Sequence, residues 1–224
     1  MCGRYSLTIT KAALQARFPG ALGDPPHEPR YNIAPSQSAP ILAAPKGERR
    51  WAAMQWGFSM TDGGRLINAR AETLTQRPMF RGLLDRFRAL VPADGFYEWP
   101  KTASAGARPR PVRIVRRDRA PFAFAALWRQ AEENSSGEFV ILTTRPNALV
   151  GPFHDRMPVV LSPEREDEWL DRDRPFAALS AALFEPWDPC EWEAYAVSDA
   201  VNRSGRDDPA CIDPAPPDGR RTLK

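Results

Sequence analysis

The sequence predicts an α+β fold in which a curved, mainly antiparallel β-sheet, or a partly closed barrel, is flanked by short helices. Two observations favour it. Short runs rich in β-branched and aromatic residues recur along the chain, whereas helical patterns are few and brief. Strands that follow one another without intervening helices favour antiparallel pairing over an alternating α/β fold. The sequence has no internal repeat, phosphate-binding glycine loop or helix-turn-helix pattern.

Length and composition indicate one soluble domain. The 224 residues suffice for a single well-buried domain, which we expect over 1–214. The chain from residue 205 is rich in Asp, Pro and Arg, so we expect a disordered tail over 215–224. No apolar run could span a bilayer and no cleavable apolar signal begins the chain, which predicts a cytoplasmic protein without a membrane partner. We expect a monomer.

Cysteine and charge content narrow the chemistry. Three cysteines without a repeating spacing argue against a disulfide framework, and no CxxC motif or Cys/His cluster suggests a metal site. The net charge is +3, and nearly all of the positive charge is arginine, which suits phosphate contacts and stacking on bases. A GC-rich genome would raise arginine, alanine and proline together, so composition alone does not establish a nucleic-acid partner.

The first half of the chain alternates short strands with loops. A strand is expected at 3–8, then a helix at 11–18 capped by Thr10, a proline-rich loop at 19–29 and a fixed turn at 31–35. Strands at 39–44 and 50–57 flank a Pro-Lys-Gly turn. Trp51, Trp56 and Phe58 in and after the second strand could stack bases, although tryptophans on a strand are more often buried.

The stretch 66–73 follows two glycines and has an apolar start. If it is extended, Asn68, Arg70 and Glu72 share one face. Three polar groups on a core-like strand are costly to bury without partners, so this face meets a ligand or solvent. A helix with arginines around it is expected at 79–87.

The stretch 89–99 is predicted to be a strand and a turn that end on Glu98, between Tyr97 and Trp99. Aromatic neighbours could desolvate this carboxyl group and raise its pKa towards the range useful for proton transfer. An outward-facing strand residue with inward-facing neighbours would give the same pattern.

The second half is expected to contain strands at 112–116, 122–128 and 139–144, with polar loops at 101–111 and 132–137. A helical turn at 147–150 precedes His154, which stands beside Asp155 and Arg156 just before a buried strand. This histidine is either a general acid/base or a structural residue. Ser162 and Pro163 begin a helix that reaches 170; a helix at 176–183 and a strand at 192–198 follow.

The first residues, Met1-Cys2-Gly3-Arg4, offer chemistry that no mid-chain cysteine has. Removal of Met1 gives Cys2 a free α-amine beside its thiol, with reference pKa values of roughly 7.7–8.0 and 8.5. Both groups are then partly nucleophilic near neutral pH. The amine can condense with an aldehyde to an imine, and the thiol can close on the imine carbon as a thiazolidine. A plain strand residue is the alternative.

Taken together, the motifs resemble the SOS-response-associated peptidase (SRAP) family over residues 1 to about 202. Each motif alone is weak, but their order along the chain is specific. The matching stretches are Met1 to Tyr5, Tyr31 to Pro35, Trp56-Gly57, Asn68 to Thr73, Gly95 to Trp99, His154 to Pro158 and Val197 to Asn202.

The resemblance implies an abasic-site sensor of single-stranded DNA. Such a protein removes its own Met1 and traps the ring-opened sugar at Cys2 as a thiazolidine, with an associated β-elimination activity and reversal of the cross-link. It implies catalytic roles for Cys2, Asn68, Glu98 and His154. Arg4 and Arg70 match phosphate-gripping positions, and Thr143 and Arg156 would line the same pocket. The resemblance requires no metal or other cofactor, and it places the protein on the nucleoid when DNA is bound.

The sequence departs from the family pattern in two places, and two other functions are open. The stretch after Trp56-Gly57 is short, which affects how neighbouring bases are wedged apart, and Arg206 replaces a common asparagine. An N-terminal-nucleophile hydrolase, such as a glutamine amidotransferase domain, also can begin Met-Cys-Gly. A non-catalytic single-strand-binding module would use the tryptophans and arginines and would bind intact and abasic strands equally.

Overall fold

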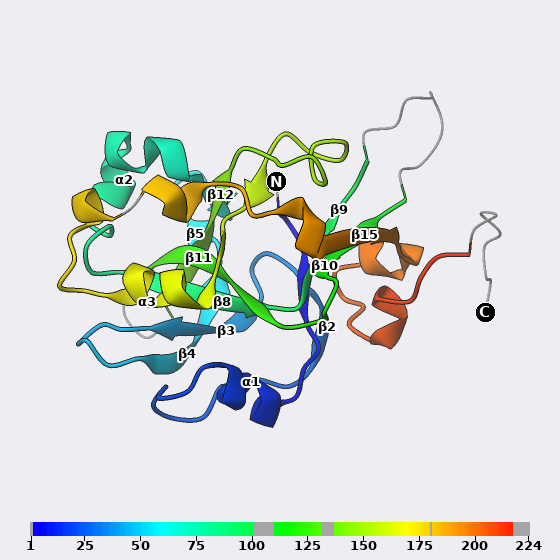
Figure 1. Ribbon diagram of the computed structural model, residues 1–224, viewed down its shortest axis with the longest axis horizontal. Helices are drawn as coiled ribbons and strands as arrows, with labels where there is room; N and C mark the ends of the chain where they lie inside the picture. Colours follow the sequence, from blue (N-terminus) through cyan, green and yellow to red (C-terminus); the bar gives the residue numbers. More distant parts are fainter. Residues whose placement is uncertain (1, 101–109, 131–136, 180, 217–224) are drawn as a thin grey trace.

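A computed structural model describes residues 2–100, 110–130, 137–179 and 181–216. In this part of the chain, a closed barrel of five strands forms the centre (Figure 1). The pairing order is β12-β4-β3-β8-β11, and β11 pairs with β12 to close the ring. All these pairs are antiparallel except β12 with β4. The barrel strands are β3 (Ser38–Ala43), β4 (Arg50–Trp56), β8 (Arg88–Ala93), β11 (Phe122–Arg129) and β12 (Glu138–Thr144).

A second antiparallel sheet lies to one side of the barrel, to the right in Figure 1. The sheet grows out of the barrel because β8 continues almost directly into β9, with a bend at Asp94. Asp94 is buried at this bend, where it accepts hydrogen bonds from Ser6 and from Arg113 at 2.7 and 2.8 Å. In pairing order, the strands of this second sheet are β15 (Trp192–Ala196), β10 (Val112–Arg116), β9 (Gly95–Glu98), β1 (Tyr5–Leu7) and β2 (Arg30–Ile33).

Short strands bring further segments to the end of β12. The chain leaves the barrel after β4 at Gly57, whose φ of +103° suits glycine, and forms the hairpin of β5 (Phe58–Ser59) and β6 (Arg65–Leu66). It returns as β7 (Asn68–Arg70), parallel to β12, with Arg70 opposite Thr143. β13 (Met157–Pro158) pairs with the same end of β12, and β14 (Val160–Leu161) pairs with β11. Loops beside this end of β12 therefore lie close together.

Helices are short and peripheral. α1 (Lys11–Arg17) begins as predicted, since Thr10 Oγ1 accepts a hydrogen bond from Ala13 N at 3.2 Å. No helix in the described part of the chain is both long enough and apolar enough to cross a membrane. The others are α2 (Pro78–Arg81), α3 (Pro163–Leu170) and the 3-10 segments η1 (Ala71–Gln76), η2 (Phe176–Ala178), η3 (Ala181–Phe184), η4 (Pro189–Glu191), η5 (Asp199–Asn202) and η6 (Pro209–Cys211).

The mainly antiparallel fold class is confirmed, but several local predictions are wrong. The helix expected at 79–87 covers only Pro78–Arg81, because the helix-weakening Gly82 follows and the chain must straighten into β8. The extended face expected at 66–73 ends at Arg70, so Glu72 lies in η1 and leaves that face. The helix expected at 176–183 is represented by two 3-10 segments.

The turn expected at 147–150 forms without becoming a helix, because the Asn147 side chain accepts hydrogen bonds from the backbone of Leu149 and Val150. Most of the polar loops expected at 101–111 and 132–137 lies outside the described residues. So does the expected tail from residue 217 onwards.

The aromatic residues of 51–58 mostly face the core. Trp56 and Phe58 are completely buried, and Trp51 is half-buried against Phe18. Trp56 also contacts Tyr5 edge-on, with ring centroids 5.2 Å apart. These rings hold β1 against the barrel, and none of these side chains forms an exposed surface for stacked bases.

Candidate active site

The site is built around Cys2, which lies just before β1 of the second sheet. Its side chain is completely buried, and its Sγ lies 3.9 Å from the carbonyl oxygen of Arg4. Asn68 Nδ2, from β7, donates a hydrogen bond to the carbonyl oxygen of Cys2 at 2.9 Å. Asn68 is itself buried, and no described residue donates a hydrogen bond to its Oδ1. The second sheet and the barrel therefore meet at the start of the chain.

Arg4 holds this chain end to the C-terminal part of the protein. Its Nη1 donates to Asn32 Oδ1 and to the carbonyl oxygen of Val201, both at 2.7 Å. Asn32 is fully buried, and its Nδ2 contacts the carbonyl oxygens of Val201, Arg203 and Arg206 at 3.2, 3.0 and 2.6 Å. Burial lowers the pKa of Arg4. The turn predicted over 31–35 is wrong for Asn32, which lies in β2 and is extended so that it pairs with β1; the sequence gives no sign of the Arg4 connection.

Glu98 reaches the same place from β9. Tyr5 of β1 pairs with Phe96, and Tyr97 N donates to the carbonyl oxygen of Arg4 at 3.0 Å, so the end of β9 lies beside the start of the chain. Glu98 is 2% exposed. Burial raises the pKa of its carboxyl group to about 7, against the opposing effect of the N-terminal positive charge and with a further increase from Asp155. The predicted desolvation of Glu98 is therefore present.

The Cys2 thiol differs from the sequence expectation. Burial, and secondly the charge of Glu98, raise its pKa far above the ordinary value. The reference value applies before any tuning by neighbours; here burial leaves a thiolate without solvation and keeps the thiol protonated. The thiol needs a nearby proton acceptor to react, and Glu98 is the carboxylate whose charge it senses.

His154 and Asp155 lie on the segment that leads into β13. His154 Nδ1 is 2.9 Å from the backbone N of Arg156 and 2.7 Å from Asp155 Oδ1. The His154 side chain is 26% exposed. Asp155 also raises the pKa of the Glu98 carboxyl group, so this segment is near enough for its charge to act on Glu98.

Arg156 and Thr143 lie together at the end of β12. The Arg156 guanidinium forms a two-pronged ion pair with Glu72, with both N–O distances 2.8 Å, and donates to the carbonyl oxygen of Thr143 at 2.6 Å. The pair with Arg156 holds the pKa of Glu72 below its usual range. Thr143 is completely buried, and its hydroxyl donates to the carbonyl oxygen of Ala69 at 3.4 Å.

Arg70 and Arg206 occupy different environments. Arg70 is exposed at the edge of β7, opposite Thr143, and forms no ion pair with any described residue. The Arg206 side chain pairs with Asp208 at 2.8 Å, while its carbonyl oxygen accepts the hydrogen bond from Asn32. The backbone at 206 makes this contact, so replacement of a common asparagine by arginine leaves it in place.

The short stretch after Gly57 is the β5–β6 hairpin. Ser59 donates to Glu138, which also pairs with Arg129 at 2.7 Å. Met60 is 37% exposed at the tip. The hairpin therefore offers a small, fixed projection in place of a long tryptophan-bearing loop.

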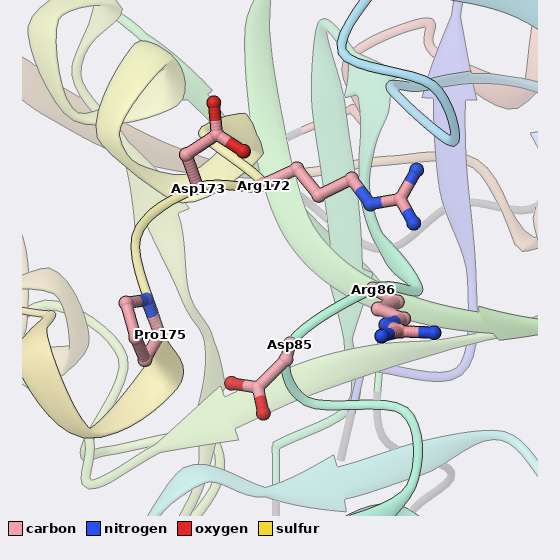
Figure 2. Close-up of a pocket in the computed structure, with 5 residues that line it drawn as sticks. All are labelled: Asp85, Arg86, Arg172, Asp173 and Pro175. Atoms are coloured by element: carbon pink, nitrogen blue, oxygen red, sulfur yellow. The ribbon is translucent and has the colours of Figure 1, made fainter.

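A surface hollow lies away from this cluster. It has a volume of about 380 Å³ and is lined by two acids, two arginines and Pro175, as Figure 2 shows. None of these side chains belongs to the Cys2 cluster. Within the described ranges, no group of three or more His, Cys, Asp or Glu side chains could hold a metal ion. The lining residues are Asp85, Arg86, Arg172, Asp173 and Pro175.

The fold and this cluster define a class: a small β-barrel protein with a candidate reactive centre at a cysteine in the second position of the chain. The chain belongs to the SOS response associated peptidase (SRAP) family, whose model matches residues 1–204.

Relatives match over nearly their full length. The chain is 36% identical to the abasic site processing protein YoqW of Bacillus subtilis, covering 95% of this chain and 99% of that protein. It is 31% identical to the abasic site processing protein YedK of Escherichia coli, covering 90% and 94%. A crystal structure of a protein from Bacteroides thetaiotaomicron matches with a TM-score of 0.79 at 24% identity, covering 96% and 100%. A phage-related protein from Bordetella bronchiseptica matches with a TM-score of 0.71 at 29% identity, covering 88% and 94%.

Proposed function

We propose that this protein processes abasic sites in single-stranded DNA by forming a covalent thiazolidine at Cys2 after removing its own Met1. The observation that carries the proposal is that two side chains act on Cys2: Asn68, whose Oδ1 has no partner among the described residues, and Glu98, whose carboxyl pKa is about 7. The names of the relatives support abasic-site processing as the activity. In this proposal, the protein acts in the cytoplasm as a monomer and needs no cofactor.

The chemistry proceeds in two steps. The Cys2 amine adds to the aldehyde of the ring-opened sugar and releases water, which leaves an imine. The sulfur then adds to the imine carbon, its proton passes to a base, and the nitrogen gains a proton, which closes the thiazolidine. Because the thiol is protonated in its buried setting, Glu98 takes the thiol proton as sulfur attacks. A carboxyl group with a pKa of about 7 suits both this transfer and its reversal.

Asn68 and His154 have positioning and proton-transfer roles. Asn68 Nδ2 already holds the Cys2 carbonyl, so its unpartnered Oδ1 can accept a hydrogen bond from the α-amine once Met1 is gone. This contact would turn the nitrogen lone pair away from Asn68 and towards the aldehyde. His154 would assist opening of the sugar. β-Elimination at the imine accounts for an associated lyase activity.

DNA binding rests on unequal contributions from the predicted residues. Arg70 is exposed and is therefore ready to contact a phosphate. Arg4 and Arg156 already have protein partners, so a phosphate would have to share them. Thr143 helps to hold Arg156 in place, because its carbonyl oxygen accepts a hydrogen bond from the Arg156 guanidinium. The burial of Trp56 and Phe58 disfavours the alternative of a non-catalytic module that stacks bases on them.

The test is capture of abasic DNA under denaturing conditions. Purified protein is incubated with matched single strands, one intact and one with an abasic site, and separated on a denaturing gel. We expect an adduct with the abasic strand only, and intact-protein mass spectrometry should give a chain without Met1. Cys2→Ser should lose the stable ring-closed product. Equal, non-covalent binding of both strands would support a binding module, and glutaminase activity would support the amidotransferase alternative.

A further inference from the structure

Two groups compete for one nitrogen of His154. The backbone N–H of Arg156 points at Nδ1 from 2.9 Å, and Asp155 Oδ1 lies 2.7 Å from the same atom. An N–H donor needs a lone pair on Nδ1, whereas a carboxylate needs a proton there. Both contacts cannot be hydrogen bonds in the same protonation state. The two partners therefore correspond to two forms of the imidazole ring.

The two competing groups are held differently. Arg156 is fixed, because its guanidinium is anchored by Glu72 and by the carbonyl oxygen of Thr143, and because β13 begins at the next residue. The His154 backbone N also donates to the carbonyl oxygen of Val150 at 3.0 Å. Asp155, in contrast, has a side chain that is 70% exposed. The N–H is thus a fixed partner for Nδ1, whereas the carboxylate approaches Nδ1 from a side chain that is mostly exposed.

We propose that Asp155 is a positioning residue that competes with the Arg156 N–H for Nδ1 and so sets whether His154 Nε2 donates or accepts a proton. The proposal rests on the proposed function of the site. With Nδ1 accepting from Arg156 N–H, a neutral ring carries its proton on Nε2 and can only donate there. With Nδ1–H donating to Asp155, Nε2 has a lone pair and acts as a base, and Asp155 stabilises the cation formed when Nε2 takes a proton.

This choice matters for opening of the abasic sugar. In that step a base takes the proton of the C1 hydroxyl, the oxygen electron pair forms the C1 carbonyl, and the C1–O4 bond breaks. O4 keeps the bond's electron pair and takes a proton from an acid or from water. Only the Asp155-bound form of His154 supplies the base. Among the described residues, the charged groups linked to this segment are Arg156 with its partner Glu72, and Glu98, on whose carboxyl group Asp155 acts.

The experiment compares Asp155→Asn with Asp173→Asn, a matched variant that makes the same change of charge at an exposed residue outside the cluster. The rate of adduct formation with abasic single-stranded DNA is measured at saturating protein from pH 5 to 9. We expect Asp155→Asn to be slower by about tenfold or more at neutral pH and to have an altered pH profile, while Asp173→Asn behaves like wild type. Affinity for an intact strand should be the same in both variants.

A second readout reports the ring directly. The chain has two histidines, so the ring nitrogens of His154 and His27 can be assigned by ¹⁵N NMR with a His27→Gln variant. We expect Asp155→Asn to shift neutral His154 towards the Nε2–H form and to leave His27 unchanged. Unchanged His154 nitrogens, or a rate equal to that of Asp173→Asn, would overturn the role of Asp155. If wild type forms no adduct, the proposed function fails, and the NMR result alone decides the role of Asp155.

Discussion

Burial of Glu98 should make the folded protein less stable as pH rises, and Glu98→Gln should remove this loss. The pKa of this carboxyl group rises from 4.5 to about 7 on folding, chiefly through burial. The folded state therefore holds the proton more tightly than the unfolded state. The stabilisation is fully present below the unfolded pKa, and it is lost as pH rises from about 4.5 through about 7.

The size of the effect follows from the pKa difference. A shift of this size corresponds to about 3 kcal/mol between the two ends of the pH window. Glutamine has nearly the same shape and stays neutral. The quantity to compare is the unfolding free energy of Glu98→Gln minus that of wild type. This difference should be about 2–3 kcal/mol larger at pH 8 than at pH 5. In a chain of this length the gain corresponds to a rise in Tm of roughly 5–10 °C.

Urea unfolding at the two pH values measures the difference, with an unchanged m value as evidence that only stability has changed. Mass spectrometry ensures that both proteins carry the same N-terminus. Glu48→Gln, at a 60%-exposed carboxylate in the turn before β4, is the control and should give equal differences at both pH values. The same difference at pH 5 and pH 8 for Glu98→Gln would refute the argument that burial tunes this acid.

Three further predictions follow from the same geometry. Iodoacetamide at pH 8 should label exposed Cys190 well before buried Cys2, and peptide mapping that finds equal labelling would contradict the raised thiol pKa. Arg113→Met should destabilise the fold by about 3–5 kcal/mol in urea unfolding, because it leaves buried Asp94 without its ion-pair partner; the double variant with Asp94→Asn should recover part of the loss. Arg70→Gln should reduce the salt dependence of single-strand binding by about 0.7 in the log–log slope, measured by fluorescence anisotropy, and an unchanged slope excludes a phosphate contact.

Several strands of both sheets were predictable from local patterns, and their arrangement was not. Strands 112–116 and 122–128 have apolar runs that predict their bounds to within one residue. Their pairing depends on long-range contacts, such as β12 beside both β4 and β7, that no local pattern specifies. The helix expected at 79–87 ends at Arg81, because Gly82 weakens it and the chain becomes extended again at the start of β8.

The candidate site was predictable as a set of residue types, and its electrostatics were not. The aromatic neighbours of Glu98 correctly indicated desolvation. Burial acts in the same direction on the Cys2 thiol and raises its pKa above the reference value, which is all that the sequence alone supplies. Arg4 was expected at a phosphate, and sequence gave no sign that Asn32 and a carbonyl oxygen 197 residues away already hold it.

These contacts of Arg4 explain how the proposed reactive residue, Cys2, can be held in place so near a chain terminus. Terminal residues fray, and ordering each one costs about 1–2 kcal/mol of backbone entropy. Two hydrogen bonds from the Arg4 guanidinium, each worth about 1.5–3 kcal/mol, offset the ordering of the residues beside it. Asn68 then fixes the Cys2 carbonyl from the opposite side. The C-terminal segment that carries Val201 contributes no reactive group, but it supplies the anchor that holds Cys2 in register with Glu98.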